Sequence, residues 1–240
     1  MKRNILIIIS IFIFIELAVI GVNIYLYLSK NIAEVAFLED WDRVERMINN
    51  DADLNAKTEE GYTALMIACD YEKEEIVELL IEGGANVNEG TIGSYPPPPI
   101  IFAVTKGNIE ITKLLIINGA DVNKTNNSSL SPLMIAILRD YSELTELIYA
   151  NIDDFNYTNE EELVIYSYIG DLDRVKELVL DKNTDPNVSI RGITPLCAAI
   201  KSENLEIIDI LIDEGADPNA KCHYGESAKD YAKEKGIDLD

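Results

Sequence analysis

A short phrase of the type Gly-Ala-Asp-x-Asn returns along this chain at a nearly constant interval. It reads GADPN at 215–219, GADVN at 119–123 and GANVN at 84–88, with weaker copies at 51–55, 153–156 and 184–187. The asparagines that close these copies are Asn55, Asn88, Asn123, Asn156, Asn187 and Asn219, at intervals of 33, 35, 33, 31 and 32 residues. A period near 33 residues, held along most of the chain, predicts an array of stacked structural repeats.

The segment 192–219, GITPLCAAIKSENLEIIDILIDEGADPN, carries the signals of two helices. Thr194 is suited to cap the first helix, and Pro195 to occupy its first position, where the missing N–H has no partner to lose. After the polar turn KSEN, large apolar residues recur at helical spacing over 205–212 and form the buried face of a second helix. Gly215 ends this helix, and the Asp and Asn of GADPN suit a turn that leads to the next repeat.

This pattern resembles the ankyrin repeat, a β-turn finger followed by two antiparallel helices. The copies, with their caps, are residues 31–57, 58–90, 91–125, 126–158, 159–188, 189–221 and 222–240. The first and last resemble capping repeats. Residues 126–158 lack the glycine after their second helix, and residues 159–188 lack the Thr-Pro entry and have Tyr166 at the usual alanine position. The resemblance implies an all-α solenoid with β-turn fingers, in which stacked neighbours bury each other's apolar faces.

Residues 1–30 have a different composition from the repeats. Residues 5–28 are almost continuously apolar, and 24 residues of helix reach about 36 Å, enough to cross a bilayer core of about 30 Å. Glu16 is the one charge inside this segment and would cost about 3 kcal/mol, which the apolar side chains outweigh. The sequence therefore predicts a single N-terminal transmembrane helix.

The charges around this segment predict its orientation. Lys2 and Arg3 precede it, so the positive-inside rule keeps the N-terminus in the cytoplasm and places the repeats on the extracytoplasmic side. The alternative is a signal peptide cleaved after VIG at 19–21, which would leave a secreted or periplasmic protein.

The net charge of the chain indicates which classes of partner it can bind. The net charge is −23, from 43 acidic and 20 basic residues. Such a surface repels phosphate groups, which argues against DNA and RNA as partners. It favours a basic protein, which long-range attraction would steer toward the repeats, although solubility alone would also explain the acid.

The sequence predicts no catalysis, cofactor or metal site. His223 is the only histidine, and P-loop, dinucleotide-binding and nucleophile-elbow motifs are missing from the sequence. One aspartate per repeat precedes the closing asparagine by two residues, which suits turn capping better than calcium binding; these are Asp53, Asp121, Asp185 and Asp217. Three cysteines are too few for a disulfide framework, and a Cys197–Cys222 bridge in an oxidising compartment stays open.

The ankyrin resemblance implies that a partner binds the concave face formed by the fingers and the exposed positions of the first helices. On this chain that face holds Glu59, Glu60, Tyr62, Asp70, Tyr71, Tyr95, Lys106, Arg139, Tyr168, Arg191, Lys201 and Tyr224. Its tyrosines suit binding hot spots, and we expect this tyrosine ladder, ringed by acids, to bind the partner. The YPPPP segment at 95–99 is interpreted as a stiff loop rather than an exposed polyproline ligand.

These features predict a non-catalytic, membrane-anchored ankyrin-repeat scaffold for protein–protein interaction. One alternative is a secreted soluble effector or inhibitor, formed after removal of a signal peptide. Another is an accessory subunit of a membrane complex, assembled through Glu16 in the apolar segment.

Overall fold

The computed structural model describes residues 31–90, 95–152, 156–222 and 225–239. Its elements are helices in antiparallel pairs, joined by turns and short β-bridged fingers, so the predicted all-α solenoid of two-helix repeats is confirmed. The predicted transmembrane helix at 5–28 lies outside the described residues. Among the helices that are described, none is both long enough and apolar enough to cross a bilayer.

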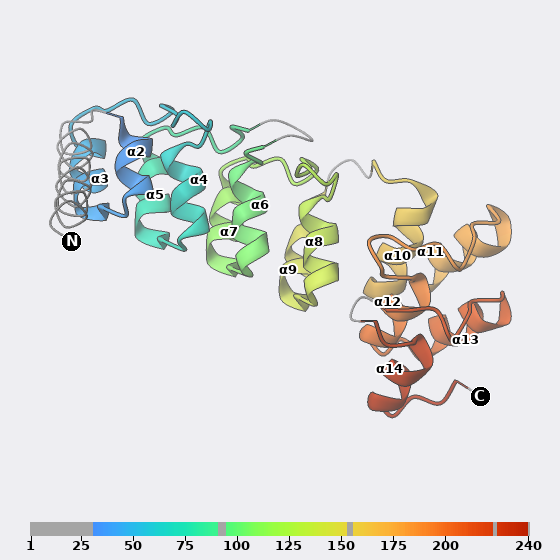
Figure 1. Cartoon of the computed structure of the whole chain (residues 1–240). Coiled ribbons are helices and arrows are strands. Elements are labelled where there is room, and N and C mark those ends of the chain that lie inside the picture. Colours follow the sequence, from blue (N-terminus) through green and yellow to red (C-terminus); the bar gives the residue numbers. More distant parts are fainter. Residues whose placement is uncertain (1–30, 91–94, 153–155, 223–224, 240) are drawn as a thin grey trace, which may run out of the picture.

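Four helix pairs form an N-terminal row (Figure 1). They are α2 (Ile32–Phe37) with α3 (Trp41–Ile48), α4 (Ala64–Asp70) with α5 (Glu74–Glu82), α6 (Pro99–Lys106) with α7 (Ile109–Ile117), and α8 (Pro132–Arg139) with α9 (Ser142–Tyr149). The C-terminal row holds α10 (Asn159–Ile169) with α11 (Leu172–Lys176) and its π-helical continuation η1 (Glu177–Asp181), α12 (Pro195–Lys201) with α13 (Leu205–Asp213), and α14 (Ala228–Glu234). Figure 1 shows the two rows running in different directions.

The core of the stack is formed by the first helix of each pair. Small side chains recur on these helices and are fully buried; they include Ala64, Ala68, Ala103, Ala136, Ala198 and Ala199. Their small size lets the first helices of neighbouring repeats approach closely. The second helices are amphipathic. In α5, for example, Ile76, Val77 and Leu80 are buried, and Glu75 and Glu78 face solvent.

Hydroxyl side chains cap the N-termini of the first helices in several repeats. Thr63, Ser131 and Thr194 each accept a hydrogen bond from the amide three residues later, at 3.2–3.3 Å. Each such cap contributes about 1 kcal/mol. Pro195 follows its cap at the first helical position. The capping predicted for Thr194 and Pro195 is therefore confirmed, and serine does the same work in α8.

The recurring GADxN phrase forms a ladder of hydrogen bonds between repeats. Asn88 Oδ1 accepts from the Asp121 amide at 2.8 Å, and its Nδ2 donates to the Gly119 carbonyl at 2.7 Å. Asn187 makes the equivalent pair of bonds to Asp217 and Gly215, at 2.7 and 2.9 Å. In these two repeats the closing asparagine thus joins its own turn to the same turn of the next repeat, which accounts for its recurrence at a nearly constant interval.

The repeated aspartates cap their own turns, as predicted. The carboxylate accepts from the amide two residues later, at 2.8–3.0 Å, in Asp53, Asp121, Asp185 and Asp217. This local bond fixes the turn, and the asparagine that follows is then aimed at the neighbouring repeat. The inter-repeat bonds were not predicted from the sequence.

The row changes direction at residues 159–188. Asn156 is followed two positions later by Thr158, the N-cap of α10, whereas Asn55 is followed by its N-cap Thr63 only after eight positions. The intervening segment is too short for a finger, and α10 begins at once. Its N-cap is a capping box, in which Thr158 and Glu161 bond each other's amides at 3.3 and 3.0 Å.

Contacts across this fingerless repeat hold the bend. Arg191 donates to the Ser128 carbonyl, and the Lys201 ammonium donates to the carbonyls of Ile137 and Leu138, both at 3.3 Å. The repeats 126–158 and 189–221 therefore touch each other past the repeat that separates them in sequence. Tyr166, which replaces the usual alanine, is accommodated in the core.

Candidate functional site

The residues predicted to contact a partner fall into three separate groups. One group lies on the fingers, one on the turns between the two helices of a repeat, and one inside the bend. Tyr224 lies outside the described residues. Among the described residues, the tyrosines of the expected ladder do not form one row, because Tyr62 and Tyr71 flank opposite ends of α4. Seven helical residues separate those ends by about 10 Å.

The finger group is centred on two tyrosines, which we call the tyrosine pair: Tyr62 and Tyr95. Their hydroxyls are hydrogen-bonded to each other, and their rings meet edge to face with centroids 5.4 Å apart. The Phe102 ring, 6.1 Å from Tyr62, supports the pair from α6. Tyr95 is 62% exposed. The fingers thus present an ordered aromatic surface to solvent.

Two features hold the tyrosine pair in place. Prolines 96–99 are buried behind Tyr95, which agrees with the interpretation of YPPPP as a stiff loop. Gly90 has φ +124°, and a Cβ on it would lie 2.8 Å from the Pro98 nitrogen, so glycine is required where the chain approaches the prolines. Glu59 and Glu60 are exposed at the tip of the neighbouring finger and give this surface a negative rim.

The second group lies at the turns that join the first and second helices. Lys106 forms an ion pair with Asp70, with Nζ and Oδ1 3.1 Å apart. Tyr71 packs against Trp41 of the preceding repeat, with ring centroids 5.8 Å apart. Trp41 was not among the predicted contact residues, because its segment was interpreted only as an N-terminal cap. Its being the one tryptophan of the chain was the available signal.

The third group is enclosed by the bend. Tyr168 is only 6% exposed and donates its hydroxyl to Asp140 Oδ1 at 2.9 Å. Burial, reinforced by the Asp140 carboxylate, raises the pKa of Tyr168 well above its usual range. The Lys201 side chain is largely buried against the α8 carbonyls, and this burial lowers the pKa of its ammonium. These side chains join parts of the chain to each other.

A shallow hollow remains open beside the bend. It has a volume of about 440 Å³, and Arg139 and Arg191 line it together with Leu130 and Leu138. Because Arg191 also bonds the Ser128 carbonyl, this side chain contributes to the bend as well as to the hollow. Arg139 is exposed.

A family model described as ankyrin repeats (3 copies) matches residues 32–126, 90–159 and 163–238. The chain belongs to the ankyrin-repeat family. It is 27% identical over 180 residues to the ankyrin repeat protein FPV031 of fowlpox virus, covering 71% of this chain and 43% of that protein. It is 24% identical over 210 residues to the ankyrin repeat protein YahD of Escherichia coli, covering 83% of this chain and 86% of that one.

Among solved structures, the ankyrin repeat domain of human ASB11 aligns with a TM-score of 0.50 and 26% identity, covering 83% of this chain and 90% of that domain. The chain spans less than half the length of the first curated relatives it matches, at 12%, 43% and 10%. The ankyrin array is thus a protein–protein interaction module, since ankyrin repeats in general bind protein partners.

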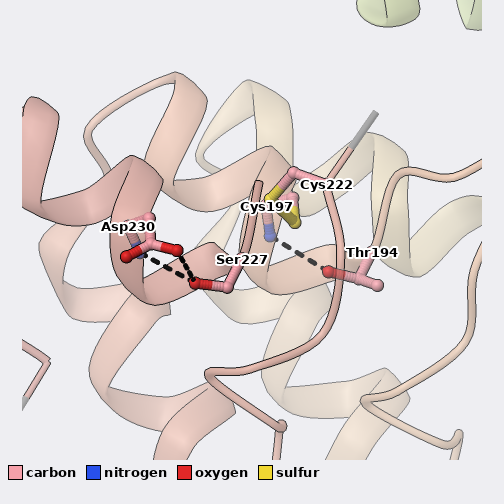
Figure 2. The surroundings of a disulfide bond; sticks show 5 residues. All are labelled: Thr194, Cys197, Cys222, Ser227 and Asp230. Atoms are coloured by element: carbon pink, nitrogen blue, oxygen red, sulfur yellow. Dashed lines mark hydrogen bonds between the residues drawn. A yellow bond between two sulfur atoms is a disulfide. The ribbon is translucent and has the colours of Figure 1, made fainter. Parts of the chain in front are cut away.

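The last ankyrin repeat is bridged to the C-terminal cap (Figure 2). Cys197 of α12 and Cys222 form a disulfide, with Cα atoms 5.8 Å apart, so the bridge left open by the sequence is present. The Cys197 amide also bonds the Thr194 cap, and Ser227 caps α14. A cavity of about 170 Å³ lies beside the bridge. Cys69 is a free, buried cysteine, and burial raises the pKa of its thiol.

Proposed function

We propose that this ankyrin protein binds a basic protein partner through the finger surface of its N-terminal row. The observation that supports this most strongly is the tyrosine pair. Tyr95 is largely exposed, yet its hydroxyl is bonded to Tyr62 and its loop is backed by buried prolines. A pre-ordered aromatic side chain loses little conformational entropy on binding, which is one reason tyrosine is enriched at hot spots.

The charge of the array supports a basic partner. The net charge is −23, and Glu59 and Glu60 lie beside the tyrosine pair. Opposite charge on the partner would speed its encounter with the fingers and favour one orientation, while the aromatic contact supplies affinity. In this proposal the protein works by binding alone and needs no cofactor, metal or catalytic residue.

The experiment is affinity capture from gently solubilised membranes, followed by mass spectrometry and a binding measurement with the captured partner. Tyr95→Ala should lower the affinity for that partner at least tenfold, which is the loss typical of an aromatic hot spot. Ile117→Ala is the matched control, because Ile117 is a highly exposed apolar side chain on the second helix α7. Equal affinity of the Tyr95→Ala variant and the parent, with circular dichroism unchanged, would exclude the finger surface.

We further propose that the array is anchored by residues 5–28 and stands on the extracytoplasmic side of a membrane. The apolar length of that segment supports the anchor. The Cys197–Cys222 disulfide supports an oxidising compartment, since the cytosol keeps thiols reduced. The alternatives are a secreted soluble form and an accessory subunit that assembles through Glu16.

N-terminal sequencing of the mature protein, combined with alkaline extraction of membranes, separates these cases. An intact N-terminus in the extracted membrane pellet supports the anchor. A new N-terminus near residue 21 in the soluble fraction supports secretion. Replacing the apolar segment by a neutral transmembrane helix tests the third case, because a complex built through Glu16 would then be lost.

A further inference from the structure

Trp41 is half-buried at the start of α3 and, together with exposed apolar side chains close to it, makes up a patch at the edge of the N-terminal row. The patch, which we call the indole patch, consists of Phe37, Leu38, Trp41 and Tyr71. Phe37, the last residue of α2, and Leu38, in the turn before α3, are 60% and 43% exposed. The Lys73 ammonium lies 5.8 Å from the centroid of the Trp41 ring, a cation–π distance. The ring thus already faces a positive charge from its own chain.

A hollow of about 410 Å³ adjoins the patch between α3 and α5. Its charged lining is one ammonium, that of Lys73, and five carboxylates, which belong to Asp42, Glu45, Glu72, Glu74 and Glu75. The Asn108 amide donates to Glu72 at 3.4 Å and to Glu74 at 3.2 Å, which orients these two carboxylates. The hollow therefore combines an aromatic wall with a fixed excess of negative charge that Lys73 offsets only in part.

We infer that the indole patch and this hollow form a docking site for a basic segment of a partner protein. In that complex an arginine or lysine of the segment stacks on Trp41 and displaces Lys73, while an adjacent apolar side chain packs on Phe37 and Leu38. Charge complementarity selects this occupant, because the carboxylates oppose both nucleic acid and an anionic membrane surface. The site is separate from the tyrosine pair, so this inference stands independently of the proposed function.

The test uses the full-length protein in a non-ionic detergent and a short peptide of alternating arginine and leucine. Because Trp41 is the only tryptophan, its fluorescence reports this site alone. We expect the peptide to shift the Trp41 emission saturably. The same peptide with citrulline in place of arginine keeps the shape and loses the charge, and we expect it to bind at least tenfold more weakly.

Paired charge variants separate a local site from the general acidity of the chain. The patch variant carries Asp42→Asn, Glu45→Gln and Glu75→Gln. The control removes the same number of exposed carboxylates from α13, by Glu206→Gln, Asp209→Asn and Asp213→Asn. We expect the patch variant to bind the peptide with about tenfold lower affinity than the parent. The control variant should lose less than twofold in affinity.

Two further variants test the aromatic contact and the role of Lys73. Trp41→Ala should lower the affinity for the peptide about tenfold, measured by calorimetry. Trp41→Phe should lose less affinity, because an aromatic ring is retained. Lys73→Ala should strengthen binding about threefold, whereas Lys233→Ala, at an exposed position on α14, should not. Equal losses in the two charge variants, equal binding of the citrulline peptide, or an unresponsive Trp41 emission would each overturn the inference.

Discussion

Replacing Asn88 with alanine should uncouple two neighbouring repeats. The side chain joins residues 58–90 to residues 91–125 through its bonds to the Asp121 amide and the Gly119 carbonyl. The backbone carbonyl of Asn88, which accepts from the Lys124 ammonium at 2.7 Å, is kept in the variant. The substitution therefore removes one rung of the ladder and little else.

The expected magnitude follows from these two bonds. Each contributes about 1 kcal/mol net, so we expect the free energy of unfolding to fall by about 2 kcal/mol. For a chain of this size that corresponds to a loss of about 4–8 °C in Tm. In a repeat array the interface terms also supply cooperativity, so the urea transition should become broader, with a smaller m-value.

Asn118→Ala provides the matched control. The Asn118 side chain donates to the Leu114 carbonyl at 2.8 Å within its own helix pair. Its loss should cost about 0.5–1 kcal/mol and leave the m-value unchanged. Both variants are compared with the parent by urea unfolding followed by circular dichroism. If the two variants lose equal stability at equal m-value, the role of Asn88 as a link between repeats is refuted.

Three further perturbations test other parts of the array. Cys222→Ser opens a disulfide that closes 25 residues, and thermal melts should show a loss of up to about 3 kcal/mol; a reductant should reproduce this in the parent only. The Lys57 ammonium, 2.7 Å from a carboxylate oxygen of Glu89, donates a hydrogen bond that lowers the pKa of that carboxyl below its usual value. The pair therefore stabilises the fold above the pKa of glutamate in the unfolded chain, and its contribution disappears as the pH falls through the lowered folded-state pKa. In urea titrations Glu89→Gln should therefore lower stability at neutral pH but not at strongly acidic pH. Gly90→Ala should cost roughly 1–3 kcal/mol in the same assay, because its Cβ would collide with the backbone at Pro98.

The sequence predicts those parts of the structure that local chemistry determines. Thr194 and Pro195 specify a helix start within a few residues, and the same local rule identifies the turn formed by Asp217. The bonds made by Asn88 could not be predicted in this way, because their partners lie more than 30 residues away and only stacking brings them close. Periodicity in the sequence predicts that a repeat exists, but it does not predict which atoms bond one repeat to the next.

The candidate site was harder to predict for the same reason. Tyr168 occupies a position that is exposed in a regular array, yet here it is buried against Asp140 because the chain bends at its repeat. Trp41 lies in a segment that the sequence marks only as an N-terminal cap, and its ring contact with Tyr71 joins two different repeats, so local pattern does not reveal it. The position of a residue within its repeat predicts the face of the helix or finger on which its side chain lies. The direction of the next repeat decides whether that side chain reaches solvent.

The bend also explains why the two proposed surfaces lie on the N-terminal row. The missing finger after Asn156 lets the flanking repeats meet, and the contacts between them use Arg191 and Lys201. Two cations predicted to lie on the concave face are thereby engaged with carbonyl groups of the chain. The N-terminal row keeps its tyrosine pair and its indole patch beside exposed carboxylates, so attraction of a basic partner acts there. Restoring a finger of normal length between Asn156 and Thr158 should release Arg191 and Lys201 and thereby weaken that preference.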